Sequence, residues 1–457
     1  MNNNFTVTSN LPSPPKGGWG VWRRGSIWLF LELIVISVVA WVVIDPAVVN
    51  LYYRSLPMMY DADQLLYAKT KPKTDADGFA DNMTEERQMQ FLRQLESMEG
   101  VESAYIYNRL NTVIGENSPF YHEVSNEKDT IWITKVPFAS NARFFETYGL
   151  RPLPGSPSAE ELSKIMKQGK PDKAVLTRKA ALTLFGTDDV VGRHFQHYGQ
   201  PDTGRPMEWI DATVMGVVED FRLSLARDIR TIIFFPYTIN HPEAHVVIRL
   251  KKGIHPGRFV EEHGQELISK GDTEFCRISK LMTFKDYIKQ SELREGNTQE
   301  VNRSLMLALF FLVNLSLAII GTVWLQAKRR TEECGVRRAF GATRPRLLLG
   351  FLSEGALMAT VAVIIGCIIY LNYAYSGLEY NEGINITHFG LEHFETMYNT
   401  SHYENPADQT WPDRFWPHFL IVSGVVYIII LCTVLIGTAI PAMKIINTRI
   451  TESLREE

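Results

Sequence analysis

The chain lacks the motifs by which most enzymes and nucleic-acid-binding proteins are recognised. It contains no Walker-type phosphate-binding loop, no H-E-x-x-H pair and no G-x-S-x-G elbow. It is therefore not expected to hydrolyse ATP by itself. No strongly basic domain and no low-complexity tail is present, which argues against binding to DNA or RNA. We expect no catalytic residues, no metal site and no bound cofactor.

Cysteine is scarce, with four residues in a chain of 457. Of these, Cys276 falls well outside the apolar segments described below, and it has no potential disulfide partner on its side of the membrane. A disulfide framework is therefore not expected, although the compartment is oxidising. The other cysteines are Cys334, Cys367 and Cys432, and their spacing is not that of metal ligands.

Four long apolar runs stand out, at 27–44, 305–325, 347–371 and 419–440. Each has about 18 residues or more, enough to cross a hydrocarbon core of roughly 30 Å. Glu32 interrupts the first run. The roughly 4–8 kcal/mol gained from its Leu, Ile, Val and Phe residues outweighs the cost of about 3 kcal/mol for one acid. We expect four transmembrane helices, the first an uncleaved anchor because no small-x-small cleavage site follows it.

Charges between the runs predict the orientation of the chain. Segment 328–346 holds seven basic residues and two acids, whereas segment 376–418 holds seven acids and one base. Short basic loops stay in the cytoplasm, so both termini are expected there. The long segment between the first two spans then lies outside. The predicted location is the bacterial cytoplasmic (inner) membrane, with the lipid bilayer as a direct partner.

These assignments predict an α-helical membrane protein with four transmembrane helices plus an α+β extracytoplasmic domain. The predicted segments are a cytoplasmic N-terminal segment (1–25), transmembrane helix one (26–45), the extracytoplasmic domain (46–303), transmembrane helix two (304–326), a cytoplasmic loop (327–346), transmembrane helix three (347–374), an extracytoplasmic loop (375–418), transmembrane helix four (419–440) and a cytoplasmic tail (441–457).

The extracytoplasmic segment carries both helix and strand signals. A helix capped by Thr84 precedes a strand at 101–107, and a helix over 259–269 precedes a strand at 275–282. We expect these two units, with a strand near 246–250, to form one α/β subdomain. Further runs predict a β-rich insertion with one short helix: strands at 131–136, 173–176, 212–218 and 231–235, and a helix over 178–185. The domain is expected to engage a substrate or partner, with a stabilising cap as the alternative.

The most specific motif lies between the second and third spans. It reads E-C-G-V-R-R-A-F-G-A-T from Glu333 to Thr343, and Glu354 follows inside the next span. The motif resembles the MacB/FtsX-like ABC permease family, which carries E-I-G-I-R-R-A-L-G-A-S here and then an acid in the next helix. The layout of one helix, a large ectodomain and three helices is also similar to that family. So are A-V-L-T at 174–177, L-F-G at 184–186 and V-M-G-V-V at 214–218.

The resemblance implies a porter-like extracytoplasmic core domain in a permease that forms a homodimer or heterodimer. It implies a separate cytoplasmic ABC ATPase that binds the ATP, and it allows a periplasmic adaptor. Spans one and two are expected to carry ATP-driven motion to the ectodomain. The implied ATPase-coupling residues are Glu333, Gly335, Val336, Arg337, Arg338, Ala339, Phe340, Gly341 and Ala342.

The coupling motif also has a direct physical reading. We expect a short helix from about 331 to 340, ended by Gly341, with an apolar edge that includes Phe340. Arg337 and Arg338 lie beside that edge, which suits docking in a groove of a soluble subunit. The simpler alternative is that the arginines serve only the positive-inside rule. That alternative explains the positive charge of the loop but not its glycines.

Three polar residues inside the predicted spans are further candidates: Glu32, Asn314 and Glu354. An intramembrane acid is expected to face protein or water, so we predict that Glu354 pairs with Lys328 or Arg329. Small and polar residues such as Asn314 are expected to mediate helix packing.

Two segments depart from the family pattern. The N-terminal segment lacks a basic amphipathic helix, and the acidic, aromatic loop at 376–418 is long. We expect an interfacial helix or cap in that loop, with a solvated loop as the alternative. The predicted function is a permease that exports or extracts an amphiphilic substrate, and lipoprotein release is the alternative within the class. A sensor or scaffold that acts without an ATPase, or an ectodomain enzyme, would lie outside the class.

Overall fold

A computed structural model describes most of the chain as two compact units. One unit contains the chain up to Ala47, the segment that begins at Arg303 and the last long helix, and the other contains Val48–Asn302. The described residues are 18–73, 84–108, 120–126, 130–139, 143–166, 172–199, 206–223, 225, 229–237, 244–294, 296–329, 331–380, 410–412 and 414–447. Most of the predicted outer loop and of the C-terminal tail lies outside these ranges.

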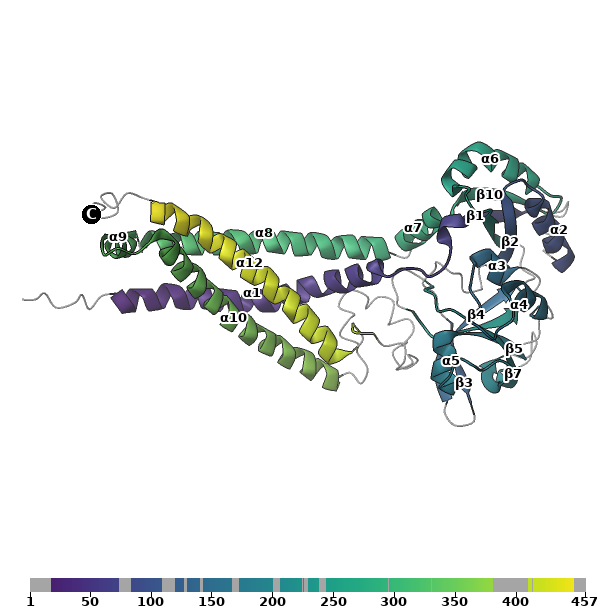
Figure 1. Ribbon diagram of the computed structural model, residues 1–457, viewed down its shortest axis with the longest axis horizontal. Coiled ribbons are helices and arrows are strands. Elements are labelled where there is room, and N and C mark those ends of the chain that lie inside the picture. The colour runs from purple at the N-terminus through teal and green to yellow at the C-terminus, as the bar shows by residue number, and fades with distance from the viewer. Residues whose placement is uncertain are drawn as a thin grey trace, which may run out of the picture. The chain divides into compact units, whose positions relative to one another are not determined.

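Four long helices span the predicted apolar runs (Figure 1): α1 (Gly18–Ser55), α8 (Asn297–Arg329), α10 (Arg344–Tyr380) and α12 (Phe415–Asn447). Each is long and apolar enough to cross a membrane, as predicted. All four continue past the predicted spans, because their polar flanks remain helical. In α1 the helix runs through Pro46, which removes one backbone donor without ending the helix.

Glycines allow close packing between the spans. A Cβ atom on Gly366 of α10 would collide with the side chain of Ser37 in α1. One on Gly437 of α12 would lie 3.0 Å from Cγ2 of Ile319 in α8. Small residues at such crossings let helix backbones approach closely. At Gly424 of α12, by contrast, nothing lies within 4 Å of the position of a Cβ atom, so no close approach of a neighbouring span requires a glycine there.

The second unit contains an α/β subdomain built from both ends of the segment, as predicted. Its four-stranded antiparallel sheet has the order β10-β1-β9-β2. The strands are β1 (Leu65–Pro72), β2 (Val101–Asn108), β9 (Ala244–Leu250) and β10 (Cys276–Thr283). The helices are α2 (Glu85–Glu96), α6 (Pro256–Lys270) and α7 (Phe284–Arg294), with a 3-10 turn at Ala62–Gln64.

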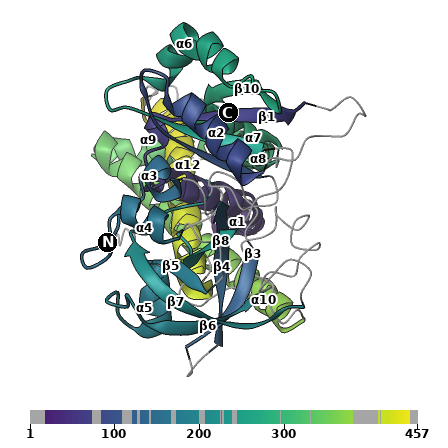
Figure 2. The same ribbon diagram turned by 90° about the vertical axis from the view of Figure 1, so that its right-hand side faces the viewer.

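The β-rich insertion is a closed barrel with the order β3-β4-β8-β5-β7-β6 (Figure 2). Its strands are β3 (Phe120–Ser125), β4 (Thr130–Ala139), β5 (Lys173–Thr177), β6 (His194–Gly199), β7 (Glu208–Val218) and β8 (Ile232–Tyr237). The same unit contains short helices: α3 (Phe144–Tyr148), which packs against β2 and β9, α4 (Ala159–Ile165), and α5 (Arg178–Phe185), which packs against the barrel strands β5, β7 and β8. Leu176, Val214 and Ile233 belong to the apolar core of the barrel.

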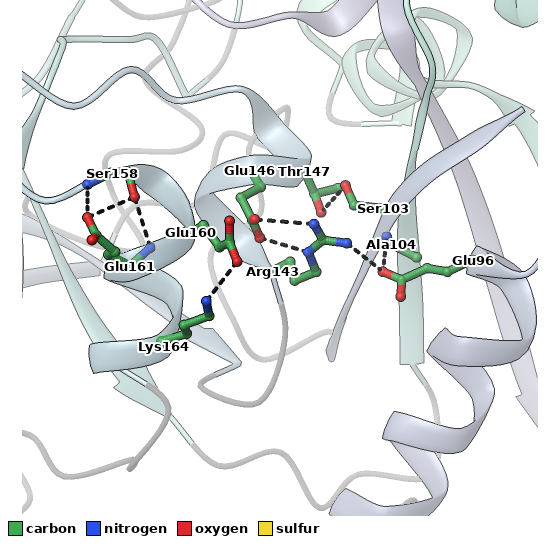
Figure 3. A network of polar contacts seen from close by, with 10 residues as sticks. All are labelled: Glu96, Ser103, Ala104, Arg143, Glu146, Thr147, Ser158, Glu160, Glu161 and Lys164. Atoms are coloured by element: carbon green, nitrogen blue, oxygen red, sulfur yellow. Dashed lines mark hydrogen bonds and ion pairs between the residues drawn. The ribbon is translucent and has the colours of Figure 1, made fainter.

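A polar network joins the α/β subdomain to α3 (Figure 3). Arg143 donates from Nε to Oε2 of Glu146 at 2.9 Å, and its Nη1 lies 3.8 Å from Oε1 of Glu96. The same Glu96 oxygen accepts a hydrogen bond of 3.0 Å from the backbone N–H of Ala104. Glu96 therefore bridges α2, β2 and the residue that precedes α3.

A second polar centre lies around the buried guanidinium of Arg249 on β9. Its Nη2 donates to Oδ2 of Asp61 at 2.6 Å and to Oε1 of Gln64 at 3.0 Å, and its Nε lies 3.3 Å from Oε2 of Glu102. Gly149, with a φ of +70°, lies directly against this centre, because a Cβ there would approach Asp61 Oδ2 to 2.6 Å. The absence of a side chain at Gly149 leaves room for the ion pair.

We expect Cys276 to be unreactive, because its thiol lies in the core of the ectodomain. The thiol is buried in the α/β core, and burial raises its pKa, with a hydrogen bond between the thiol and the Thr273 hydroxyl opposing the shift. Because the thiolate is the reactive form, a maleimide at pH 8 should label Cys276 only after denaturation. A Glu266→Cys variant, at an exposed position of α6, is the reactive control. Equal labelling rates for the two thiols in the native protein would contradict the position of β10 in the core.

Candidate coupling site and intramembrane contacts

The predicted coupling loop folds as a short helix, α9 (Thr331–Ala339). Gly341 follows it with a φ of +92°, a backbone conformation that residues with a Cβ rarely adopt. The N–H of Gly341 donates to the carbonyl of Arg338, and the N–H of Ala342 donates to that of Arg337, both at 3.0 Å. These two bonds satisfy the last carbonyls of the helix and stop it sharply. The predicted end at Gly341 is confirmed.

The two sides of α9 differ in burial. Cys334 and Gly335 are buried, whereas the side chains of Val336 and Phe340 are 45% and 89% exposed. Val336 and Phe340 are four residues apart, so they lie on the same side of the chain, and the exposed Arg337 is next to them. The result is an uncovered apolar edge with positive charge beside it. The predicted edge residue Ala339 is also exposed, and the side chain of Glu333 lies outside the described residues.

An apolar cluster fixes the end of α9 to spans three and four. Ala342, directly after the helix end, packs against a cluster formed by Leu347 of α10 and by Ala442 and Ile446 of α12. Helix α9 itself also contacts α12. A displacement of α9 is therefore expected to move the adjacent ends of α10 and α12, because close-packed apolar groups transmit force.

The predicted intramembrane residues have different environments. Glu32 is half-buried, and its Oε2 lies 3.4 Å from Oγ1 of Thr322, whose hydroxyl also donates to the carbonyl of Ala318 at 2.9 Å; this contact links spans one and two. Asn314 is exposed on α8, and its amide donates to the carbonyl of Phe310 at 2.8 Å within the same helix. Its described hydrogen bond thus satisfies its own helix rather than a neighbouring span.

Glu354 lies half-buried on α10, beside a close helix contact. A Cβ on the next residue, Gly355, would lie 3.2 Å from Oγ1 of Thr438 in α12. Glu354 therefore lies next to the contact between spans three and four. The side chains of its predicted partners, Lys328 and Arg329, lie outside the described residues, so that pairing stays a prediction.

Sequence reasoning did not predict a buried polar contact at the other end of the spans. Oδ1 of Asp45 in α1 and Nε2 of His418 in α12 are 2.7 Å apart, and the two side chains are 5% and 2% exposed. One turn earlier, Trp41 Nε1 donates to Ser423 Oγ at 3.0 Å, and the Trp41 ring stacks on Tyr370 with centroids 3.9 Å apart. The only signal in the sequence is that Asp45 and His418 flank apolar runs on the same predicted side.

Comparisons with known families agree with this architecture. Residues 30–265 match the family described as the MacB-like periplasmic core domain, and residues 305–450 match the FtsX-like permease C-terminal family. The first match alone covers more than half of the chain. The chain belongs to the MacB/FtsX-like permease family. It is thus an ABC-type permease and a membrane protein, and the α/β subdomain with its barrel is the periplasmic core domain of this permease.

Three solved structures that are similar to this chain each match about half of it. The periplasmic region of MacB from Actinobacillus actinomycetemcomitans is 12% identical over 50% of this chain and 92% of that one, with a TM-score of 0.30. The extracellular domain of the ABC-type transporter YknZ from Gram-positive bacteria is 13% identical over 47% and 100%, with a TM-score of 0.28. A permease domain from Porphyromonas gingivalis is 15% identical over 49% and 91%, with a TM-score of 0.28. No curated protein matches the chain.

Proposed function

We propose that this permease receives motion from a separate cytoplasmic ATPase through α9 and passes it to the periplasmic core domain. The observation that supports the proposal is the exposed edge of Val336 and Phe340 beside Arg337. A rigid amphipathic helix of this kind can dock in a groove of a partner subunit. The turn at Gly341 and the apolar cluster at Ala342 keep α9 in a fixed relation to the ends of spans three and four.

The remaining parts of the proposal follow from sequence and family. The chain carries no Walker-type phosphate-binding loop, so nucleotide hydrolysis is assigned to the partner subunit. We place the permease in the inner membrane with both termini in the cytoplasm, because the basic loop between spans two and three favours that side. It acts as a homodimer or with a sister permease, and it exports or extracts an amphiphilic substrate, with a periplasmic adaptor as a further partner.

Labelling of single cysteines tests the orientation on which this function depends. We expect a membrane-impermeant maleimide to label Glu266→Cys in intact spheroplasts and Thr343→Cys only after permeabilisation. Both positions are exposed in the structure, so a difference in labelling reports the side of the membrane and not burial. Labelling of Thr343→Cys in intact spheroplasts would place α9 outside the cytoplasm, where no ATP is available, and would contradict the proposal.

A further inference from the structure

We propose that Asp45 and His418 tether span four to span one, and that span four is part of the path from α9 to the periplasmic core domain. This inference rests on the proposed function and adds a route to it. The expected route follows spans one and two, which Glu32 and Thr322 connect. The structure carries a second connection, through spans three and four.

The first step of this route is the apolar cluster beside α9. Ala342 packs against Ala442 and Ile446, which are in the last turns of α12. From there α12 continues as one helix to Phe415 and packs along α10, and it carries a buried row that includes Val426 and Ile430. Pro441 lies inside α12 directly before Ala442 and favours bending there, whereas the packed helix between Pro441 and His418 is expected to move as one stiff element.

The second step is the contact between Asp45 and His418. Both side chains are almost fully buried, and their polar atoms lie 2.7 Å apart. Removing one member of such a pair leaves the other buried without it, which is strongly unfavourable in a low-dielectric region. The spans are therefore expected to move together at this point and not to slide past one another.

Trp41 strengthens the same contact from one turn away. Trp41 and Asp45 are four residues apart on α1, so they share one face of the helix. From that face, the Trp41 indole donates a hydrogen bond to Ser423 of α12 and stacks on the ring of Tyr370 of α10. Two adjacent turns of span one are thus held to span four (α12), and one of them also to span three (α10).

The third step is the passage from span one into the core domain. Pro46 follows Asp45 directly, and a proline inside a helix removes one hydrogen bond and favours bending there. Beyond it, the end of α1 is fastened within the core-domain unit. Arg222 Nη1 donates to the carbonyl of Leu56 at 2.6 Å, and Arg54 lies 3.7 Å from the buried Glu292. The tether thus acts immediately before Pro46, and from Val48 onward the helix belongs to the core-domain unit.

Hydrogen exchange on the permease–ATPase complex in lipid nanodiscs tests the inference. In the wild type, trapping with ATP should change exchange both in α9 and in residues 47–56. In Asp45→Asn and in His418→Gln, the change in α9 should remain, whereas the change in 47–56 should fall roughly 5-fold, a loss expected for a coupling residue. Exchanging the pair, Asp45→His with His418→Asp, should restore part of the response.

Two controls keep the result interpretable. Tyr427→Phe removes a 3.2 Å contact between Tyr427 and Thr360 that joins α12 to α10 without involving α1, and it should leave both responses intact. If the Asp45 and His418 variants fail to assemble, the milder Ser423→Ala variant should show the same selective loss at 47–56. An unchanged response at 47–56 in the assembled variants would overturn the tether. No ATP response in α9 of the wild type would instead overturn the proposed function.

Discussion

Replacing Arg337 and Arg338 with glutamate is expected to abolish co-purification of the ATPase with the permease in mild detergent. The two substitutions reverse the charge beside the exposed apolar edge of α9, and opposing a like charge across an interface typically costs several kcal/mol. Folding of α9 should survive, because glutamate is as good a helix former as arginine. Negative charge in the last turn opposes the helix dipole by only about 0.3–1 kcal/mol. Affinity capture of the permease, followed by quantification of the bound ATPase, measures the effect.

Arg344 and Arg346 provide a matched control for this result. Both are exposed and lie just beyond Gly341, so their replacement by glutamate changes the net charge of the loop equally. We expect this control to retain most of the ATPase. Equal losses in both variants would mean that general loop charge, and not the α9 edge, governs the interaction. Retention of the ATPase in both would mean that neither pair of arginines governs the interaction, and absence of an ATPase from the wild-type sample would favour a sensor or scaffold that acts without one.

Gly149→Ala should destabilise the periplasmic core domain by about 2–4 kcal/mol. A Cβ at this position would approach Asp61 Oδ2 to 2.6 Å and Arg249 Nη1 to 2.7 Å, which forces the ion pair apart. The side chain of Arg249 is 7% exposed, so the displaced guanidinium could not be hydrated fully in place. The φ of +70° adds strain for any residue with a Cβ. Thermal unfolding of the whole permease, followed by intrinsic fluorescence, measures the loss.

Gly155→Ala separates the two causes. Gly155 has a φ of +90°, but nothing lies within 4 Å of the position of its Cβ. Its substitution should therefore cost only the backbone strain, about 1–2 kcal/mol. If Gly149→Ala were no more destabilising than this control, the Arg249 centre would contribute little to the stability of the domain.

The sequence predicted those parts of the fold that depend on local signals. Long apolar runs identify the spans, because the bilayer sets their length. Gly341 identifies the end of α9, because a left-handed residue is required there. The strand at β2 follows a well-capped helix, with Thr84 accepting from the N–H of Arg87. In each case the neighbouring residues carry enough information.

What the sequence did not predict depends on contacts between distant residues. Strand β1 was missed because Lys69 and Lys71 interrupt its apolar pattern, although it pairs with both β9 and β10 in the sheet. Closure of the barrel depends on pairing between strands that are far apart in the chain, such as β3 with β6, which no local pattern encodes. The pair of Asp45 and His418 joins residues 373 positions apart. Such a pair becomes visible only when the packing of the spans is known.

The two sheets of the core domain differ in their tendency to aggregate. The closed barrel offers no free edge to a neighbouring chain, whereas the open sheet ends at β10 and β2. A free edge strand can template pairing with another unfolded or partly folded molecule, and charged side chains on the edge oppose this. Strand β10 carries the exposed Arg277 and Lys280 along its length. Their positive charges are expected to oppose the addition of a further strand at this edge.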